Sequence, residues 1–110
     1  MKVHPLLRGS LETIILSLLA ENNEMYGYEI TKNVKESTEG ELNITEGALY
    51  PALHKLETKG MLTIRYETVN NRRRKYYSLT EEGGNYQKEK VSEFQEFVAN
   101  MARVLNSKVA

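Results

Sequence analysis

The stretch that decides the fold runs from Thr45 to Glu67 and reads TEGALYPALHKLETKGMLTIRYE. Its first part predicts a helix, because the apolar residues recur at helical spacing on one face. That face consists of Ala48, Leu49, Ala52, Leu53 and Leu56. Thr45 is a suitable N-cap, and Gly60 is a suitable stop because glycine accepts the left-handed conformation that closes a helix. After Gly60, apolar and polar residues alternate, which predicts that the helix leads directly into a strand.

The segments that follow predict a hairpin. The alternation over 62–67 returns over 75–79, and the intervening residues 68–74 contain an Asn-Asn pair suited to positive φ and three successive arginines. The sequence therefore predicts a two-stranded hairpin with a basic tip, one of whose adjacent tyrosines, Tyr76 or Tyr77, lies in the core.

Two helices are expected before this stretch. One apolar stripe follows Ser10, a plausible N-cap, and ends at the Asn22-Asn23 pair; its members are Leu11, Ile14, Ile15, Leu18 and Leu19. A second helix is expected from Tyr26 or Gly27 to Ser37. The alternation over 41–44 resembles a very short strand.

A long helix is expected after the hairpin. Thr80 can cap it, with acidic residues in the first turn where the helix dipole favours negative charge. The pair Gly83-Gly84 in that turn indicates close packing of the backbone, because glycine is costly in a helix. Over residues 91–105 of this helix, apolar residues recur at heptad spacing, which predicts an apolar surface that a second copy of the chain would cover. Its residues, with two that widen it, are Val91, Phe94, Phe97, Val98, Met101, Val104 and Leu105.

Together these elements predict a mostly α, α+β fold: a winged helix-turn-helix over residues 1–80, followed by a dimerisation helix over 81–110. A chain of 110 residues has room for one hydrophobic core. The alternative for the last helix is that it folds back on its own domain.

Composition excludes several function classes. The chain has no Cys, no Asp and two His residues, His4 and His54. Disulfides, thiolate catalysis and cysteine-ligated metals are therefore excluded, and the two histidines have no metal-ligand spacing. We expect no enzyme, no cofactor, no metal and no membrane segment, and a cytoplasmic location.

The zero net charge conceals a division along the chain. Residues 9–53 carry two Lys against eight Glu, whereas residues 54–76 carry seven basic against two acidic residues. Such asymmetry is typical of a nucleic-acid-binding face. It also occurs by chance in short polar loops.

Three blocks resemble the PadR family of bacterial transcriptional regulators. They are YGYEI at 26–30, EGALYPALHKLE at 46–57 and RRKYYSLTEEG at 73–83, in the family's order and spacing. The resemblance implies an N-terminal winged helix, a C-terminal dimerisation helix and sequence-specific operator binding, usually as a repressor. The short tail is similar to the compact subfamily with one long C-terminal helix. The chain has no Trp, unlike the drug-responsive members, so it does not indicate a flat aromatic ligand site.

On this interpretation the third helix lies in the major groove with its polar face toward the bases. Its candidate DNA-binding residues are Thr45, Gly47, Ala48, Tyr50, Pro51, His54 and Lys55. Pro51 removes one internal hydrogen bond and should bend this helix or constrain its first turn. Tyr50 has the alternative of packing on the second helix, and His54 of being an ordinary surface histidine.

The hairpin supplies the other DNA-binding candidates: Asn71, Arg72, Arg73, Arg74 and Lys75. Arginines at such a tip can straddle a phosphate strand or enter a narrow minor groove. The alternative is a solvated loop. Tyr26 and Tyr28 are expected to be half-buried with an exposed hydroxyl, and the sequence does not say which of them reaches a phosphate.

The expected partners are a double-stranded DNA operator and a second copy of the chain. A two-fold dimer would place two recognition helices about 34 Å apart, so we expect a near-palindromic operator. A small-molecule inducer bound near Phe94 and Phe97 is a further hypothesis. The rival to the whole interpretation is a winged-helix protein-interaction module without DNA affinity.

Overall fold

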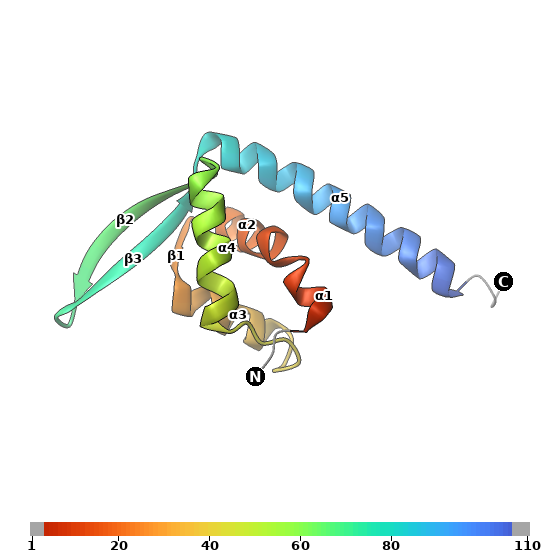
Figure 1. The fold of residues 1–110 in the computed structure, drawn as a ribbon, viewed down its shortest axis with the longest axis horizontal. Helices are drawn as coiled ribbons and strands as arrows, with labels where there is room; N and C mark the ends of the chain where they lie inside the picture. The colour runs from red at the N-terminus through yellow and green to blue at the C-terminus, as the bar shows by residue number, and fades with distance from the viewer. Residues whose placement is uncertain (1–3, 107–110) are drawn as a thin grey trace.

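The computed structural model describes residues 4–106, which form one elongated body with principal extents of 59 × 32 × 20 Å. Its elements are α1 (Pro5–Arg8), α2 (Leu11–Asn22), β1 (Glu24–Tyr26), α3 (Gly27–Ser37), α4 (Glu46–Thr58), β2 (Leu62–Val69), β3 (Arg72–Leu79) and α5 (Glu81–Asn106). Figure 1 shows α4 between the β2–β3 hairpin on one side and α2 with α5 on the other. This is the predicted mostly helical winged-helix architecture, with a small antiparallel sheet and a long last helix.

Helix α4 begins and ends where the sequence predicts. The Thr45 hydroxyl accepts a hydrogen bond from the Ala48 amide at 3.2 Å, and Gly60 follows the helix with φ of +80°. Leu49, Leu53 and Leu56 are fully buried, so the predicted apolar face is the one that packs. The helix continues through Pro51, which leaves the Gly47 carbonyl without its usual amide donor.

The hairpin is longer and tighter than the sequence pattern indicates. Strands β2 and β3 pair from Leu62↔Leu79 to Val69↔Arg72, and the turn consists only of Asn70 and Asn71, with φ of 50° and 64°. Positive φ at both central residues gives the turn that suits the twist of a hairpin, and asparagine tolerates it. The predicted connection over 68–74 is therefore wrong, and its three arginines are strand residues. Tyr77 is the buried member of its pair, as one of the two was expected to be.

The third strand was not predicted. β1 pairs antiparallel with β3, from Glu24↔Ser78 to Tyr26↔Tyr76. The short strand expected over 41–44 is wrong, because this segment links α3 to α4 and has no neighbouring strand to pair with. The side chain of Ile44 is buried in the core instead.

Two features near the N-terminus also differ from expectation. The short helix α1 was not anticipated, and Ser10, although it occupies the N-cap position of α2, does not cap it with its side chain. The Ser10 hydroxyl instead donates to the carbonyls of Leu6 and Leu7, at 3.0 and 3.1 Å. The Ser10 amide also donates to the Leu7 carbonyl at 3.0 Å, so the serine secures the carbonyl end of α1 instead of capping the start of α2.

The long helix α5 starts at a tight contact with the hairpin. The Thr80 hydroxyl accepts from the Gly83 amide at 3.0 Å, as predicted for an N-cap. A Cβ on Gly83 would collide with the carbonyl group of Met61, whereas a Cβ on Gly84 would meet nothing within 4 Å. The predicted close packing is therefore confirmed for Gly83 and wrong for Gly84. Among residues 4–106, no helix has the length and apolar content needed to cross a bilayer.

These neighbouring glycines provide a matched test of the packing. We expect Gly83→Ala to lower the free energy of unfolding by about 1–3 kcal/mol, because the backbone of Met61 cannot easily yield. Gly84→Ala should raise it by about 0.5–1 kcal/mol, because alanine loses less backbone entropy in a helix. Thermal or denaturant unfolding measures both changes, and equal effects from the two substitutions would contradict the assignment.

Candidate nucleic-acid interface

The face of α4 opposite its buried leucines is exposed to solvent. Gly47, Pro51, His54 and Lys55 are all exposed, and Tyr50 is 45% exposed. The sequence placed these residues on one face, and the structure agrees. Thr45 and Ala48, which were also DNA-binding candidates, are partly buried at the start of the helix.

Tyr50 lies on the exposed face of α4 and also packs against α3, so both positions predicted for it are partly correct. Its hydroxyl end lies so close to Gly27, the first residue of α3, that a Cβ there would collide with it. Even so, the Tyr50 side chain is partly exposed. The contact holds the tyrosine across the junction of α3 and α4, where it lines a groove.

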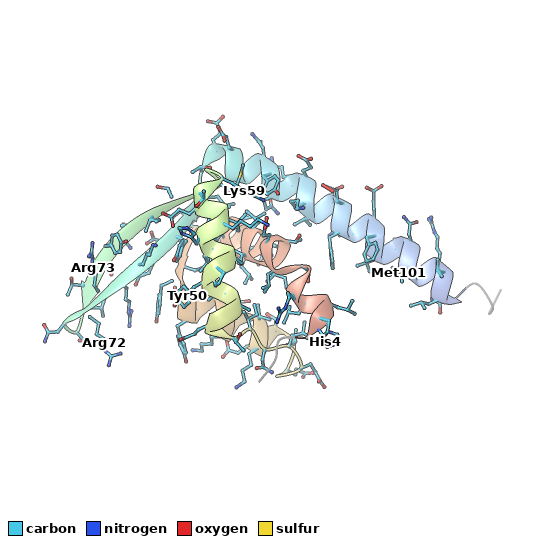
Figure 2. All side chains as sticks on the ribbon, viewed as in Figure 1. His4, Tyr50, Lys59, Arg72, Arg73 and Met101 are labelled. Atoms are coloured by element: carbon cyan, nitrogen blue, oxygen red, sulfur yellow. The ribbon has the colours of Figure 1, made fainter. Side chains whose placement is uncertain are left out.

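This groove runs between α4 and the free part of β3, and has a volume of about 680 Å³. It is lined by Tyr26, Tyr28, Tyr50, Arg72, Arg73, Arg74, Lys75 and Tyr77. Among the described residues, β1 pairs only with Tyr76–Ser78, so the groove lies beside the part of β3 that has no strand on that edge. Figure 2 shows Tyr50 on α4 and both Arg72 and Arg73 toward the far end of the hairpin.

Strand alternation sends the arginines to opposite faces of the hairpin. Arg73 stacks on Tyr66, with its guanidinium carbon 3.8 Å from the ring centre. Arg74 lies on Tyr26 at 4.4 Å. A hydrogen bond with Tyr76 is the main reason that the pKa of Arg74 lies above its ordinary value. Two of the three arginines are thus held by aromatic rings while they keep their charge.

Arg65 is basic and lies in the neighbouring strand, but its charge is neutralised. Its guanidinium donates to Glu24 at 3.1 Å through Nε and to Glu67 at 2.8 Å through Nη1. The hydrogen bond from Arg65 holds the pKa of the Glu24 carboxyl below its usual range. Arg65 therefore braces β1 against β2 and offers little charge to a ligand.

Two lysines predicted to contact DNA also have carboxylate partners. Lys55 lies 3.4 Å from Glu12 of α2, and Lys75 lies 3.5 Å from Glu57 of α4. The second pair joins the hairpin to α4. Glu57 is half-buried, and its buried carboxylate oxygen, Oε1, is the one that forms the ion pair with Lys75.

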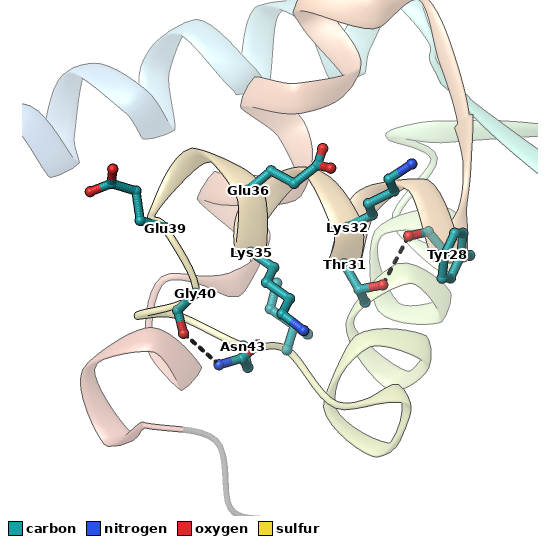
Figure 3. Close-up of a pocket in the computed structure, with 9 residues that line it drawn as sticks. Tyr28, Thr31, Lys32, Lys35, Glu36, Glu39, Gly40 and Asn43 are labelled. Atoms are coloured by element: carbon teal, nitrogen blue, oxygen red, sulfur yellow. Dashed lines mark hydrogen bonds between the residues drawn. The ribbon is translucent and has the colours of Figure 1, made fainter.

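A separate hollow lies along α3 and the connection to α4 (Figure 3). Its two lysines, Lys32 and Lys35, are balanced by two glutamates, Glu36 and Glu39, so it has no excess of positive charge. The Asn43 side chain closes one end by donating to the Gly40 carbonyl at 2.9 Å. This hollow is therefore a weaker candidate for binding a polyanion than the groove beside β3.

The far half of α5 presents the predicted apolar stripe to solvent. Phe97 is 58% exposed and Leu105 is 74% exposed, whereas Val91 is partly covered. The other exposed members are Phe94, Val98, Met101 and Val104. The first half of α5 packs against α2. The alternative that the last helix folds back on its own domain therefore holds only for this half.

The Arg65 bridge makes a testable prediction about acid sensitivity. Because the folded-state pKa of Glu24 is lowered, its stabilising contribution is present above the unfolded-state pKa and is lost as pH falls through the folded value. NMR titration of the Glu24 side-chain carboxyl should show this low pKa, and Arg65→Gln should return it toward the ordinary value. A Glu24 titration unchanged by Arg65→Gln would contradict the bridge.

Comparisons with known proteins match most of the chain. A model of the transcriptional regulator PadR-like family matches residues 15–89. The chain is 37% identical over 92 residues to an uncharacterized protein X of Lysinibacillus sphaericus, covering 83% of this chain and 84% of that one. It is 32% identical over 81 residues to the transcriptional regulator YqjI of Escherichia coli, covering 74% of this chain but only 37% of that protein.

Solved structures agree with this. A transcriptional regulator from Clostridium thermocellum superposes with a TM-score of 0.78 at 37% identity, over 96% of this chain and 97% of that one. A PadR family transcription regulator from Clostridium difficile superposes with a TM-score of 0.74 at 35% identity, over 88% of this chain and 99% of that one. With the winged-helix fold and the matched residues in agreement, the chain belongs to the PadR-like family of transcriptional regulators, which are not enzymes.

Proposed function

We propose that this protein is a cytoplasmic repressor that binds a near-palindromic DNA operator as a homodimer. The observation that carries the proposal is the groove between α4 and β3, where four tyrosines and three arginines border an exposed helix face. Phosphates are bound by arginine and by tyrosine hydroxyls, and bases are contacted by a helix in the major groove. The family membership supports the same conclusion.

In this arrangement α4 enters the major groove with Gly47, Pro51 and His54 toward the bases. The small side chain of Gly47 and the free amides at the start of α4 allow close approach to a phosphate. Arg72 and Arg74, on one face of the hairpin, bind the phosphate backbone that runs beside the groove. Arg73 and Asn71 extend the contact along the other face and the turn. Lys55 and Lys75 contribute charge that their carboxylate partners reduce.

The second copy would pack along α5. Its exposed stripe repeats at heptad spacing over residues 91–105, which is the pattern of helices that pair in a coiled coil. A contiguous apolar surface of this kind is a usual mark of a protein interface. A two-fold axis between paired α5 helices would place the two α4 helices on one face of a duplex, about one helical turn apart.

Relief by a small-molecule inducer is part of the proposal and rests on two exposed aromatic residues. The rings of Phe94 and Phe97 lie 6.4 Å apart on α5. A ligand bound between them and the partner copy would change the spacing of the two α4 helices, and with it operator affinity.

DNA binding is tested with a duplex chosen from random sequences by the purified protein. If each protomer neutralises about four phosphates, the logarithm of the binding constant should fall with the logarithm of salt concentration at a slope of about −7. The triple variant Arg72→Ala, Arg73→Ala, Arg74→Ala should lose most of the affinity and flatten the slope. Lys88→Ala, an exposed lysine on α5, is the control and should leave both unchanged.

Fluorescence anisotropy at several salt concentrations measures both quantities. Equal affinity for the triple variant and the wild type would remove the hairpin from the interface. No binding to any duplex at low ionic strength would favour the protein-interaction module instead.

The homodimer is tested by sedimentation. Phe97→Asp places a charge in the apolar stripe and should convert the protein to a single copy, because burying an unpaired charge in the interface is costly. Ala99→Asp introduces the same charge on the opposite side of α5, about 200° around the helix axis from Phe97, and should leave the dimer intact. A wild-type protein that sediments as one copy at all concentrations would contradict the proposal.

A further inference from the structure

A second basic pocket lies on the other side of α4, between α2 and α5. Its volume is about 480 Å³, and it shares no residue with the groove beside β3. We call it the α2–α5 pocket and define it by its charged and aromatic residues: Arg8, Glu12, Lys55, Lys59, Tyr86 and Lys90. They come from the end of α1, the start of α2, the second half of α4 and the first half of α5. Figure 2 shows Lys59 at the end of α4 that lies beside α5.

Glu12 and Tyr86 organise the cations of this pocket. The Glu12 carboxylate lies 3.4 Å from the Lys55 ammonium and 3.3 Å from that of Lys59. The ammonium groups of Lys59 and Lys90 each lie 5.6 Å from the centre of the Tyr86 ring. Four cations, Arg8, Lys55, Lys59 and Lys90, therefore line the pocket together with one carboxylate, Glu12.

The central lysine remains charged. Partial burial lowers the pKa of Lys59, but the hydrogen bond to Glu12 and the attraction of Glu12 and Tyr86 outweigh that effect, and its pKa lies above the ordinary value. The pocket thus keeps an excess of positive charge at neutral pH, which is the requirement for binding an anion.

The position of the pocket beside α4 indicates which kind of anion it binds. Tyr50 borders the groove beside β3 and Lys55 borders the α2–α5 pocket. Five residues of an α-helix turn about 140° around its axis, so the two basic hollows flank α4 and its exposed face lies between them. Pro51 and His54 belong to that face.

We propose that the α2–α5 pocket binds backbone phosphates of the DNA strand opposite the one bound by the hairpin groove. The inference rests on the proposed function, in which α4 enters the major groove. That groove is about 12 Å wide, close to the diameter of a helix with its side chains, so a helix inserted in it has a phosphate strand on each side. One strand faces the arginines of β3, and the other faces Arg8, Lys59 and Lys90.

The first test removes charge from the pocket. The double variant Lys59→Gln, Lys90→Gln should weaken duplex binding at least tenfold at moderate salt and flatten the salt slope by about four in a dimer, since each lost phosphate contact lowers the slope by about one. Lys88→Gln, on the same helix as Lys90, is the matched control and should change neither quantity. Unfolding and sedimentation, measured alongside, should match the wild type.

The second test changes the charge in the opposite direction. Glu12→Gln removes the carboxylate from the same pocket, so it should tighten duplex binding several-fold and steepen the salt slope. A role limited to holding the fold together would not produce tighter binding. Adding inorganic phosphate to the free protein at constant ionic strength checks for an independent small-anion site.

The outcomes separate this inference from the proposed function. Wild-type affinity and slope in both the double variant and Glu12→Gln, while the triple arginine variant loses binding, would overturn the α2–α5 pocket alone. Chemical shift changes at Lys59 and Lys90 with phosphate but unchanged duplex binding in the variants would also overturn it. A wild-type protein that binds no duplex would overturn both.

Discussion

The burial of one face of α4 is the constraint on which the rest of the structure depends. Leu49, Leu53 and Leu56 are fully excluded from solvent, and their packing sets the rotation of the helix about its axis. Because that rotation is set, the face of α4 opposite the leucines is exposed. One side of the helix then borders the groove beside β3, and the other side borders the α2–α5 pocket. Gly60 then reverses the chain at the end of α4 with a left-handed backbone, so the hairpin starts at a defined place beside the helix.

Aromatic rings give the basic residues defined positions without neutralising them. Arg73 lies over Tyr66, Arg74 over Tyr26 and Lys90 near Tyr86, whereas Lys59, which also lies near Tyr86, is paired with Glu12 as well. A cation over a ring keeps its full charge, whereas a cation beside a carboxylate loses most of its field at a distance. Arg65 has both arrangements: its guanidinium lies 4.6 Å from the centre of the Tyr76 ring and is also paired with Glu24 and Glu67, so this cation joins two strands and is less available to a ligand than Arg73 or Arg74.

Periodicity in the sequence predicts most of the elements, and contacts between distant residues account for what it misses. The faces of α4 and α5 follow from helical spacing, and the capping residues Thr45 and Thr80 follow from local chemistry. The strand predicted from the alternation over 41–44 is wrong because a strand also needs a neighbour, and β3 instead pairs with β1. Short-range patterns carry no information on such pairing.

The same limit applies to the charges of the candidate site. In the sequence Arg65 and Arg74 are equivalent basic residues of a hairpin, and only the fold brings Glu24, 41 positions away, to Arg65. Likewise, Lys59 is an ordinary helix-terminal lysine until the fold places Glu12, 47 positions away, beside it. The pocket that results contains Lys55 and Lys59 from α4 and Lys90 from α5, the helix whose far half carries the apolar stripe. Because α5 packs against α2, the distance of Lys90 from the two lysines of α4 depends on that packing. The helix proposed to join two copies therefore also sets the charge distribution beside the helix proposed to enter DNA.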